Sequence, residues 1–250
     1  MERHPLKISV VIPAYNEAST ISPTLTAILA QDYPDFEVIV VDNASIDNTS
    51  MVVDEIISAR RKAQNASEAR PKIRLVHESK KGLLHARERG RKEATGDIVA
   101  NMDADCLPEK NWLSLAAKYF SHNNVVAVSG PYDYFDAHPT FRTSSLLMQN
   151  YIYRPIAYVL QLPFIRGGAV LIGGNNLIRA DILQKMGGYN TSLVFYGEDT
   201  DTAKRVAKHG KVVFNPKIKM KTSARRFKKE GTLKMTARYL FYFFKHTLRG

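Results

Sequence analysis

Two aspartates stand one residue apart at the end of an apolar run, in the stretch "ANMDADCLP" at residues 100–108. Side chains alternate along a strand, so Asp103 and Asp105 point to the same side and bring two like charges together. A positive partner stabilises such a pair, and a divalent cation, which prefers oxygen ligands, is a suitable one. The structural alternative is a turn, because aspartates are common in turns and caps and Pro108 favours a helix start.

Four apolar runs, each followed by a helical pattern, make up the first half of the chain. The runs are continuous rather than alternating, as expected for strands covered on both faces. This alternation of strand and helix predicts a doubly wound, mostly parallel α/β sheet. The predicted strands span residues 7–12, 36–42, 73–78 and 97–103, and the predicted helices span about 19–31, 49–62, 82–94 and 109–120.

Three of the four predicted strands end in residues that can bind a ligand. Ligands of open parallel sheets gather at the carboxyl ends of the strands. The first strand is followed by "PAYNE", the second by "VDNAS" and the fourth by the aspartate pair. Neither GxGxxG nor GxxxxGK[ST] occurs, which argues against a Rossmann dinucleotide site and a P-loop. The residues expected to converge at this edge are Pro13, Tyr15, Glu17, Asp42, Asp103 and Asp105.

The second half of the chain is less regular. Residues 125–135 and 211–223 each predict a strand, and residues 198–210 predict a helix closed by Gly210. Residues 142–166 are long and aromatic and fit no single pattern. The pattern of this half therefore predicts no single arrangement of its strands and helices.

The composition is that of a globular protein. The 250 residues are 44% hydrophobic and 24% charged, so disorder is not expected. Cys106 is the single cysteine, which excludes an internal disulfide framework and fits a reducing, cytoplasmic location. The first residues lead into a strand without a signal peptide, and no apolar run is long enough to predict a membrane span.

The net charge of +12 is concentrated in one segment. Residues 217–250 contain eleven Lys or Arg against a single acid, Glu230, so the rest of the chain is nearly neutral. A basic nucleic-acid-binding module is one interpretation. It gives no place to the buried strands and clustered acids of residues 1–216, so we expect no nucleic-acid partner.

Four segments follow one another along the chain: "VVIPAYNEASTI", "VIVVDNASIDNT", "NMDADCLP" and "GEDTDTAKRVAKHG". In this order and spacing they resemble the motifs of family 2 glycosyltransferases, which have the GT-A fold. The stretches "KGLLHARERGRKEATGDIV" and "GGNNLIRADILQKMGGYN" are similar to the approach to the family's metal strand and to its acceptor-side segment. The resemblance covers roughly residues 7–215 and implies inverting transfer of a sugar from a nucleotide-activated donor.

The resemblance implies where the donor binds. Asp42 corresponds to the aspartate that reads the base, usually uracil. An aspartate can accept a hydrogen bond from the N3–H of uracil. Asn43 departs from the acid that is usual at the next position, which leaves the base open. Arg87 corresponds to an arginine that meets the diphosphate or holds the aspartates. The lining of the base and ribose pocket corresponds to Pro13, Ala14, Tyr15 and Glu17.

The DxD motif of the family corresponds to Asp103, Ala104 and Asp105. The resemblance implies that Asp105 binds a divalent cation, Mn²⁺ or Mg²⁺, and that Asp103 binds the ribose or a metal-bound water. The cation then neutralises the leaving diphosphate. Further along, Arg225 and Arg226 carry guanidinium forks that suit phosphate oxygens, although a solvated basic loop accounts for them equally well.

The acid pair Glu198–Asp199 opens a predicted helix. Asp199 corresponds to the family's catalytic base, which takes the proton of the acceptor hydroxyl as it attacks. The structural alternative is that both acids stabilise the helix N-terminus. Gly174 and Asn175, in the acceptor-side segment, are expected to contact the acceptor.

The expected organisation is one GT-A domain over residues 1–230, with a nucleotide-sugar half to about residue 121 and an acceptor half from residue 122. The acceptor itself is left open between a glycan, a lipid-linked molecule and the cell envelope. A nucleotidyltransferase that makes a nucleotide sugar is an alternative activity, but "PAYNEAST" is not the glycine-rich, basic loop that it needs. A non-catalytic scaffold is a second alternative, against which the intact acidic motifs argue.

The segment 231–250 predicts a basic amphipathic helix. Its apolar stripe and flanking Lys and Arg residues suit a peripheral position in the headgroup plane of an anionic membrane, on the cytoplasmic face. The alternative is that the helix packs on the catalytic domain or on a second subunit, and the oligomeric state stays open. The stripe consists of Leu233, Ala237, Leu240, Phe241 and Phe244.

Overall fold

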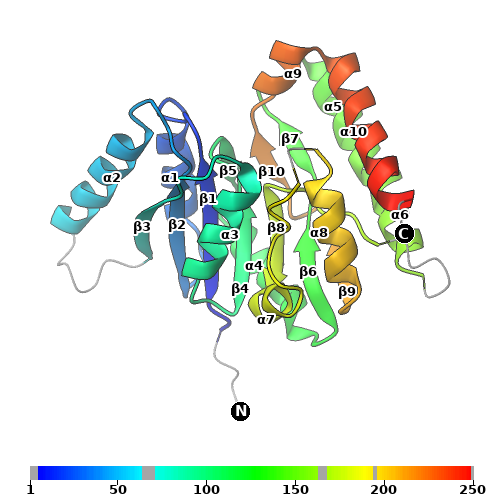
Figure 1. Ribbon diagram of the computed structural model, residues 1–250, viewed down its shortest axis with the longest axis horizontal. Coiled ribbons are helices and arrows are strands. Elements are labelled where there is room, and N and C mark those ends of the chain that lie inside the picture. The colour runs from blue at the N-terminus through cyan, green and yellow to red at the C-terminus, as the bar shows by residue number, and fades with distance from the viewer. Residues whose placement is uncertain (1–4, 64–70, 163–167, 194–195, 249–250) are drawn as a thin grey trace.

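The computed structural model describes residues 5–63, 71–162, 168–193 and 196–248. The main strands are β1 (Ile8–Ala14), β2 (Phe36–Asp42), β3 (Lys72–His77), β4 (Ile98–Met102), β6 (Val125–Ser129), β8 (Asn175–Arg179) and β9 (Lys211–Phe214). They form one seven-stranded sheet in the order β3-β2-β1-β4-β8-β6-β9 (Figure 1). β3, β2, β1 and β4 are parallel, and β8 is antiparallel to both of its neighbours. The predicted mostly parallel α/β sheet is confirmed.

Helices cover both faces of this sheet. Leu25, Val53 and Trp112 are buried on one face, and Leu84 and Val206 are buried on the other. The first face carries α1 (Ile21–Leu29), α2 (Thr49–Ala63) and α4 (Trp112–Ala117), and the second carries α3 (Leu83–Glu93), α7 (Ala180–Lys185) and α8 (Glu198–Ala207). The continuous apolar runs of the sequence are thus explained, because the central strands are shielded from water on both sides.

The helix predicted over residues 109–120 is shorter in the structure. The aspartate pair is followed by a short strand, β5 (Cys106–Pro108), so α4 begins only at Trp112. It ends at Ala117, and a 3₁₀ turn, η1 (Lys118–Ser121), continues it. Pro108 closes a strand here rather than starting a helix.

A second, three-stranded sheet has the order β5-β10-β7, with β7 (Tyr132–Tyr134) and β10 (Met220–Thr222). The predictions of single strands over residues 125–135 and 211–223 are therefore wrong, because each segment divides between the two sheets. The first division falls at Gly130, where a Cβ would lie 1.9 Å from the carbonyl oxygen of Ile218. This close approach turns the chain out of the main sheet, and it admits only glycine.

The aromatic stretch that fitted no pattern is a broken helix. It consists of α5 (Pro139–Met148), a π turn η2 (Gln149–Tyr153) and α6 (Arg154–Leu160). Prolines stand at the first turn of α5 and of α6, a position that tolerates their missing N–H. Side chains such as Tyr151, which is 74% exposed, leave the outer face of this helix apolar.

The basic C-terminal segment forms two helices, α9 (Arg225–Glu230) and α10 (Thr232–Leu248). Arg225 and Arg226, for which a solvated basic loop was the alternative, thus lie in a helix. α10 packs against α8 and α9, and Met235 is fully buried. Of the predicted outer stripe, Ala237 and Phe241 are exposed, and the side chains of Leu233, Leu240 and Phe244 lie outside the described residues. Within the described part of the chain, no helix combines the length and apolar character that a bilayer span requires.

Candidate active site

A cavity of about 450 Å³, here called the acidic cleft, opens at the carboxyl ends of β1 and β4. It brings together most of the site residues that were predicted from the sequence. Its wall also includes residues from α9 and α10, so the basic C-terminal segment is part of the site. The predicted residues that line it are Pro13, Ala14, Tyr15, Glu17, Arg87, Asp103, Ala104, Asp105, Gly174, Glu198, Asp199, Arg225 and Arg226.

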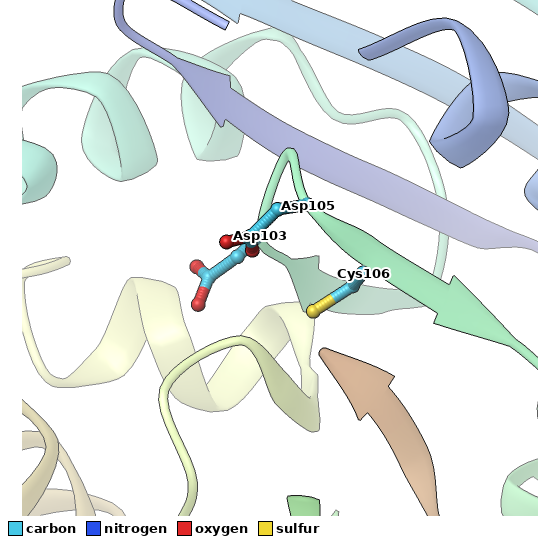
Figure 2. A group of neighbouring side chains, drawn as sticks. All are labelled: Asp103, Asp105 and Cys106. Atoms are coloured by element: carbon cyan, nitrogen blue, oxygen red, sulfur yellow. The ribbon is translucent and has the colours of Figure 1, made fainter. Parts of the chain in front are cut away.

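The aspartate pair lies in the turn between β4 and β5 (Figure 2). Ligand atoms of Asp103, Asp105 and Cys106 lie within 4.8 Å of one another. Carboxylate oxygens suit a hard divalent cation. Cys106 does not fit that role, because burial raises the pKa of its thiol well above the usual value and keeps it protonated. The two carboxylates therefore fit a divalent cation, and the thiol belongs to the core.

A positive group already faces Asp105. The Nε of Arg225 lies 3.2 Å from one carboxylate oxygen, and the Thr222 hydroxyl donates to the other at 3.4 Å. Arg225 also forms an ion pair with Glu17, so it joins two acids of the cleft. Burial and the neighbouring Asp103 raise the pKa of Asp105 to about 6, although Arg225 opposes this shift. The guanidinium occupies the kind of position that a bound cation takes.

Arg87 connects the two acidic ends of the cleft. Its guanidinium lies 3.4 Å from Asp103 and 3.3 Å from Asp199, and only 5% of its side chain is exposed. Burial alone would lower the pKa of Arg87, but Asp199 and Asp103 outweigh that effect and raise the pKa. Arg87 therefore carries a fixed positive charge between a candidate metal ligand and the candidate base.

Asp199 lies in the first turn of α8, and the N–H of Gly173 donates to its carboxylate at 3.0 Å. Burial and the neighbouring Glu198 raise the pKa of Asp199 to about 7, although Arg87 opposes this shift. Glu198 is 6% exposed, and its Oε2 has no hydrogen-bond partner within the described residues. A carboxyl that titrates near neutral pH in a cleft is suited to general-base chemistry.

Two glycines let the acids approach the backbone. A Cβ on Gly173 would lie 2.3 Å from an Asp199 oxygen, and a Cβ on Gly174 would lie 2.2 Å from an Asp103 oxygen. The hydroxyl of Tyr132 donates to this same aspartate at 2.8 Å. Gly174, predicted to contact the acceptor, thus lies directly behind the aspartate pair.

Two predicted residues are placed behind the wall. Within the described chain, Asp42 and Asn175 are not among the lining residues. Burial acts to raise the pKa of Asp42, but hydrogen bonds from Ser45 and Ser50 outweigh burial and lower it. Asn175 is fully buried, and its amide accepts from Trp112 at 2.9 Å and donates to backbone carbonyls. These hydrogen bonds hold β8 in place, and contact of Asn175 with the acceptor stays a prediction.

Several lining residues escaped the sequence reasoning. Lys81 lies 4.9 Å from the ring centre of Tyr15 and donates to its hydroxyl at 3.2 Å. The paired lysines before Gly82 were a signal for it, since a basic residue before a helix start suits an anion. The aromatic members have no local signal, because they come from segments whose packing the sequence did not predict. They are Tyr132, Tyr134, Phe227 and Tyr239.

The sequence model of glycosyl transferase family 2 matches residues 9–187, more than half of the chain. Glycosyltransferase AglE of Haloferax volcanii is 27% identical over 205 residues, which cover 81% of this chain and 62% of AglE. The enzyme WfgD of Escherichia coli, named as a UDP-Glc:α-D-GlcNAc-diphosphoundecaprenol β-1,3-glucosyltransferase, is 32% identical over 126 residues, 50% of this chain and 46% of WfgD. The chain thus spans about half to three fifths of these relatives.

Solved structures share the fold. Mannosyltransferase PcManGT from Pyrobaculum calidifontis, in complex with GDP-Man and Mn²⁺, has a TM-score of 0.71 at 24% identity, with 99% of this chain and 65% of that chain covered. Glucosyl-3-phosphoglycerate synthase from Mycobacterium tuberculosis, in complex with Mn²⁺, UDP-Glc and phosphoglyceric acid, has a TM-score of 0.60 at 20% identity, with 97% and 80% covered. At these identities the likeness establishes the architecture.

Proposed function

Because the chain belongs to glycosyl transferase family 2, we propose that it transfers a sugar from a nucleoside diphosphate sugar to an acceptor hydroxyl with inversion. One observation carries the proposal: a single cleft holds a carboxylate pair suited to a cation and, across Arg87, a third carboxyl whose pKa of about 7 suits a base. Residues 1–230 form the catalytic domain in this proposal, with donor-side and acceptor-side halves that meet near residue 121.

The donor occupies the β1 and β4 side of the cleft. The base and ribose lie over Pro13, Ala14 and Tyr15, and we propose a UDP-sugar as the donor, in line with the UDP-Glc in the name of WfgD. Asp103 and Asp105 would hold a divalent cation, Mn²⁺ or Mg²⁺, which when bound supplies charge to neutralise the diphosphate. Arg225 and Arg226 extend the positive charge on the opposite wall of the cleft.

The transfer step needs one base and one leaving group. The acceptor oxygen attacks the anomeric carbon while its proton passes to an Asp199 carboxylate oxygen, and the bond from that carbon to the nucleoside diphosphate oxygen breaks. The electron pair of that bond leaves with the nucleoside diphosphate. Arg87 holds Asp199 in place, and the Gly173 N–H fixes its second oxygen at 3.0 Å. A base positioned in this way contributes about 10²–10⁴-fold to rate.

Crystals soaked with UDP and Mn²⁺, and in parallel with GDP and Mn²⁺, test this proposal. We expect UDP to bind with its base over Tyr15 and its diphosphate near Asp105 and Arg225, and Mn²⁺ to contact Asp105. Binding of the nucleotide on another face, or the same occupancy without Mn²⁺, would contradict the proposal. A stronger GDP density would change the base but keep the reaction.

The acceptor side includes a membrane surface in our proposal. Phe241 on α10 is 61% exposed, and Arg238 and Lys245 stand three residues before it and four residues after it on the same helix, as in a peripheral helix on the cytoplasmic face of an anionic membrane. Flotation with phosphatidylglycerol vesicles at low salt tests this. We expect Phe241→Asp to bind the vesicles about tenfold less. The variant lacks the phenyl group, whose partial transfer from water into the membrane contributes about 1.4 kcal/mol. Ile46→Asp, at a residue 83% exposed on the donor side, is the matched control. Equal flotation of the two variants would refute membrane contact through α10.

A further inference from the structure

A second cavity, here called the apolar cavity, has a volume of about 630 Å³ and lies between α5–η2–α6 and α10. Figure 1 shows α5, α6 and α10 at the same edge of the molecule, and residues of all three line the cavity. The volume falls within the range of about 300–1,000 Å³ that small-molecule sites occupy. Its walls are mostly hydrocarbon and aromatic, and they include Phe141, Met148, Ile156, Val170 and Tyr242.

The apolar cavity meets the acidic cleft at the candidate base. Glu198 and Asp199 line both spaces, and so does an aromatic group made of Tyr132, Tyr134, Phe227 and Tyr239. The rings of Tyr134 and Phe227 are 5.2 Å apart, and Phe141 packs against both. A molecule whose hydroxyl reaches Asp199 can therefore place its remaining part in the apolar cavity.

Two of the buried polar residues that line the apolar cavity differ in their hydrogen bonds. Gln149 is fully used: its amide accepts from the Tyr132 N–H at 2.8 Å and donates to the Tyr132 carbonyl at 2.9 Å. Glu198 differs, because its Oε2 is buried without a partner in the described chain. Ser144, Thr200 and Thr236 also belong to the lining, but its greater part is hydrocarbon and aromatic.

Apolar residues continue from this cavity to the protein surface. Ile152 lines the cavity and is 51% exposed, and Leu147 and Tyr151 on the same broken helix are 52% and 74% exposed. Exposed apolar residues that adjoin a cavity mark a route for an apolar ligand. A plain glycan would leave both the surface and the cavity without a partner.

We propose that the apolar cavity binds the hydrocarbon chain of a lipid-linked acceptor, whose hydroxyl lies next to Asp199. This inference rests on the proposed function, since it takes the reaction at Asp199 as given and names the acceptor class. The hydrocarbon chain of the acceptor lies between α5–α6 and α10, and its sugar or headgroup faces the acidic cleft.

Photolabelling with a dodecyl β-glucoside that carries a diazirine in its alkyl chain tests the inference, below the micelle concentration. We expect the label in residues 139–160 and 168–172. Met148→Trp fills the cavity and should reduce labelling about tenfold, equivalent to 1.4 kcal/mol. Tyr158→Trp changes an exposed residue of α6 that does not line the cavity and should label normally. Dodecyl β-glucoside should compete, and methyl β-glucoside should not. If Met148→Trp fails to fold, Ile156→Phe fills the same space and replaces it.

Three outcomes would overturn the inference: label on other surfaces, equal labelling of the two tryptophan variants, or equal competition by the methyl glucoside. Binding of UDP with Mn²⁺ is measured on the same samples and should be unchanged by Met148→Trp. If the unmodified protein does not bind UDP with Mn²⁺ but is still labelled in the cavity, the proposed function is contradicted and the lipid site stands.

Discussion

The two acidic centres of the cleft differ in the arginine that faces each of them. Arg225, beside Asp105, is 48% exposed and belongs to the short helix α9. Arg87, beside Asp199, is 5% exposed and belongs to α3 within the main domain. Burial raises the pKa of both carboxyls, to about 6 for Asp105 and about 7 for Asp199. An aspartate carboxylate thus faces an arginine in both centres. The arginine is half-exposed at Asp105 and buried at Asp199.

This difference assigns different chemistry to the two centres. A partly exposed ion pair is worth about 0–1 kcal/mol, so ligands can displace Arg225 at little cost. Arg87 itself is buried, with 5% of its side chain exposed, and a buried charge left without a partner is strongly unfavourable, so we expect Arg87 to stay with Asp199 through the reaction. A centre that exchanges its cation suits a metal and a diphosphate, and a centre with a fixed cation suits a base that must keep its position.

The largest expected effect comes from removing the carboxylate of Asp105, whose cationic partner is expected to exchange. Asp105→Ala should abolish divalent-dependent transfer while the protein stays folded, because the carboxylate contributes to the cation site and not to the core. Transfer assays with Mn²⁺ and with excess EDTA, together with thermal unfolding, measure this. Asp181→Ala, at an acid 58% exposed on α7, is the control and should be fully active. Full turnover in EDTA would show that the first centre is not a metal site.

The fixed centre is tested by Asp199→Asn. The variant keeps a side-chain oxygen for the Gly173 N–H but cannot take a proton, so we expect kcat to fall about 10²–10⁴-fold with nucleotide binding unchanged. Asp201→Asn removes an acid from the same helix and should retain nearly full activity. Normal turnover by Asp199→Asn, combined with weak UDP binding, would move Asp199 to the donor site.

The sequence predicted the donor-side half of this comparison much better than the acceptor side. Asp103 and Asp105 were found because β1 to β4 are continuous buried strands whose ends must share one edge, whereas Arg87, on α3, came from the resemblance to the family. Asp199 was found only through the resemblance to the family. Tyr132, Tyr239 and the apolar cavity were not found at all, because they depend on β7, α5–α6 and α10. These elements have mixed patterns, and long-range packing decides where they lie.

The pH dependence of the reaction should separate the centres further. A base must be ionised, and burial raises the pKa of Asp199 to about 7. Activity should therefore fall about tenfold for each pH unit below that value, as protonation removes the base. Profiles of kcat/KM from pH 5 to 9 measure this, with UDP binding over the same range as the control. A flat kcat/KM profile below pH 7 would exclude Asp199 as the base in the free enzyme.

The smallest effect concerns the removable cation itself. Arg225→Met leaves Asp105 and Glu17 without their shared partner, so the free cleft becomes more negative and should bind Mn²⁺ more tightly in the absence of nucleotide. A half-exposed ion pair of about 1 kcal/mol limits this gain to about fivefold. Affinity for UDP in the presence of Mn²⁺ should fall by a similar factor, because the same guanidinium is then lost as a diphosphate ligand. Calorimetric titrations with Mn²⁺ and with UDP plus Mn²⁺ measure both, and Lys229→Met, which removes the same charge from an exposed position of α9, is the matched control. Opposite signs for the two ligands are the signature of an exchanging cation, whereas equal losses for both would mean that Arg225 only supports the fold of α9.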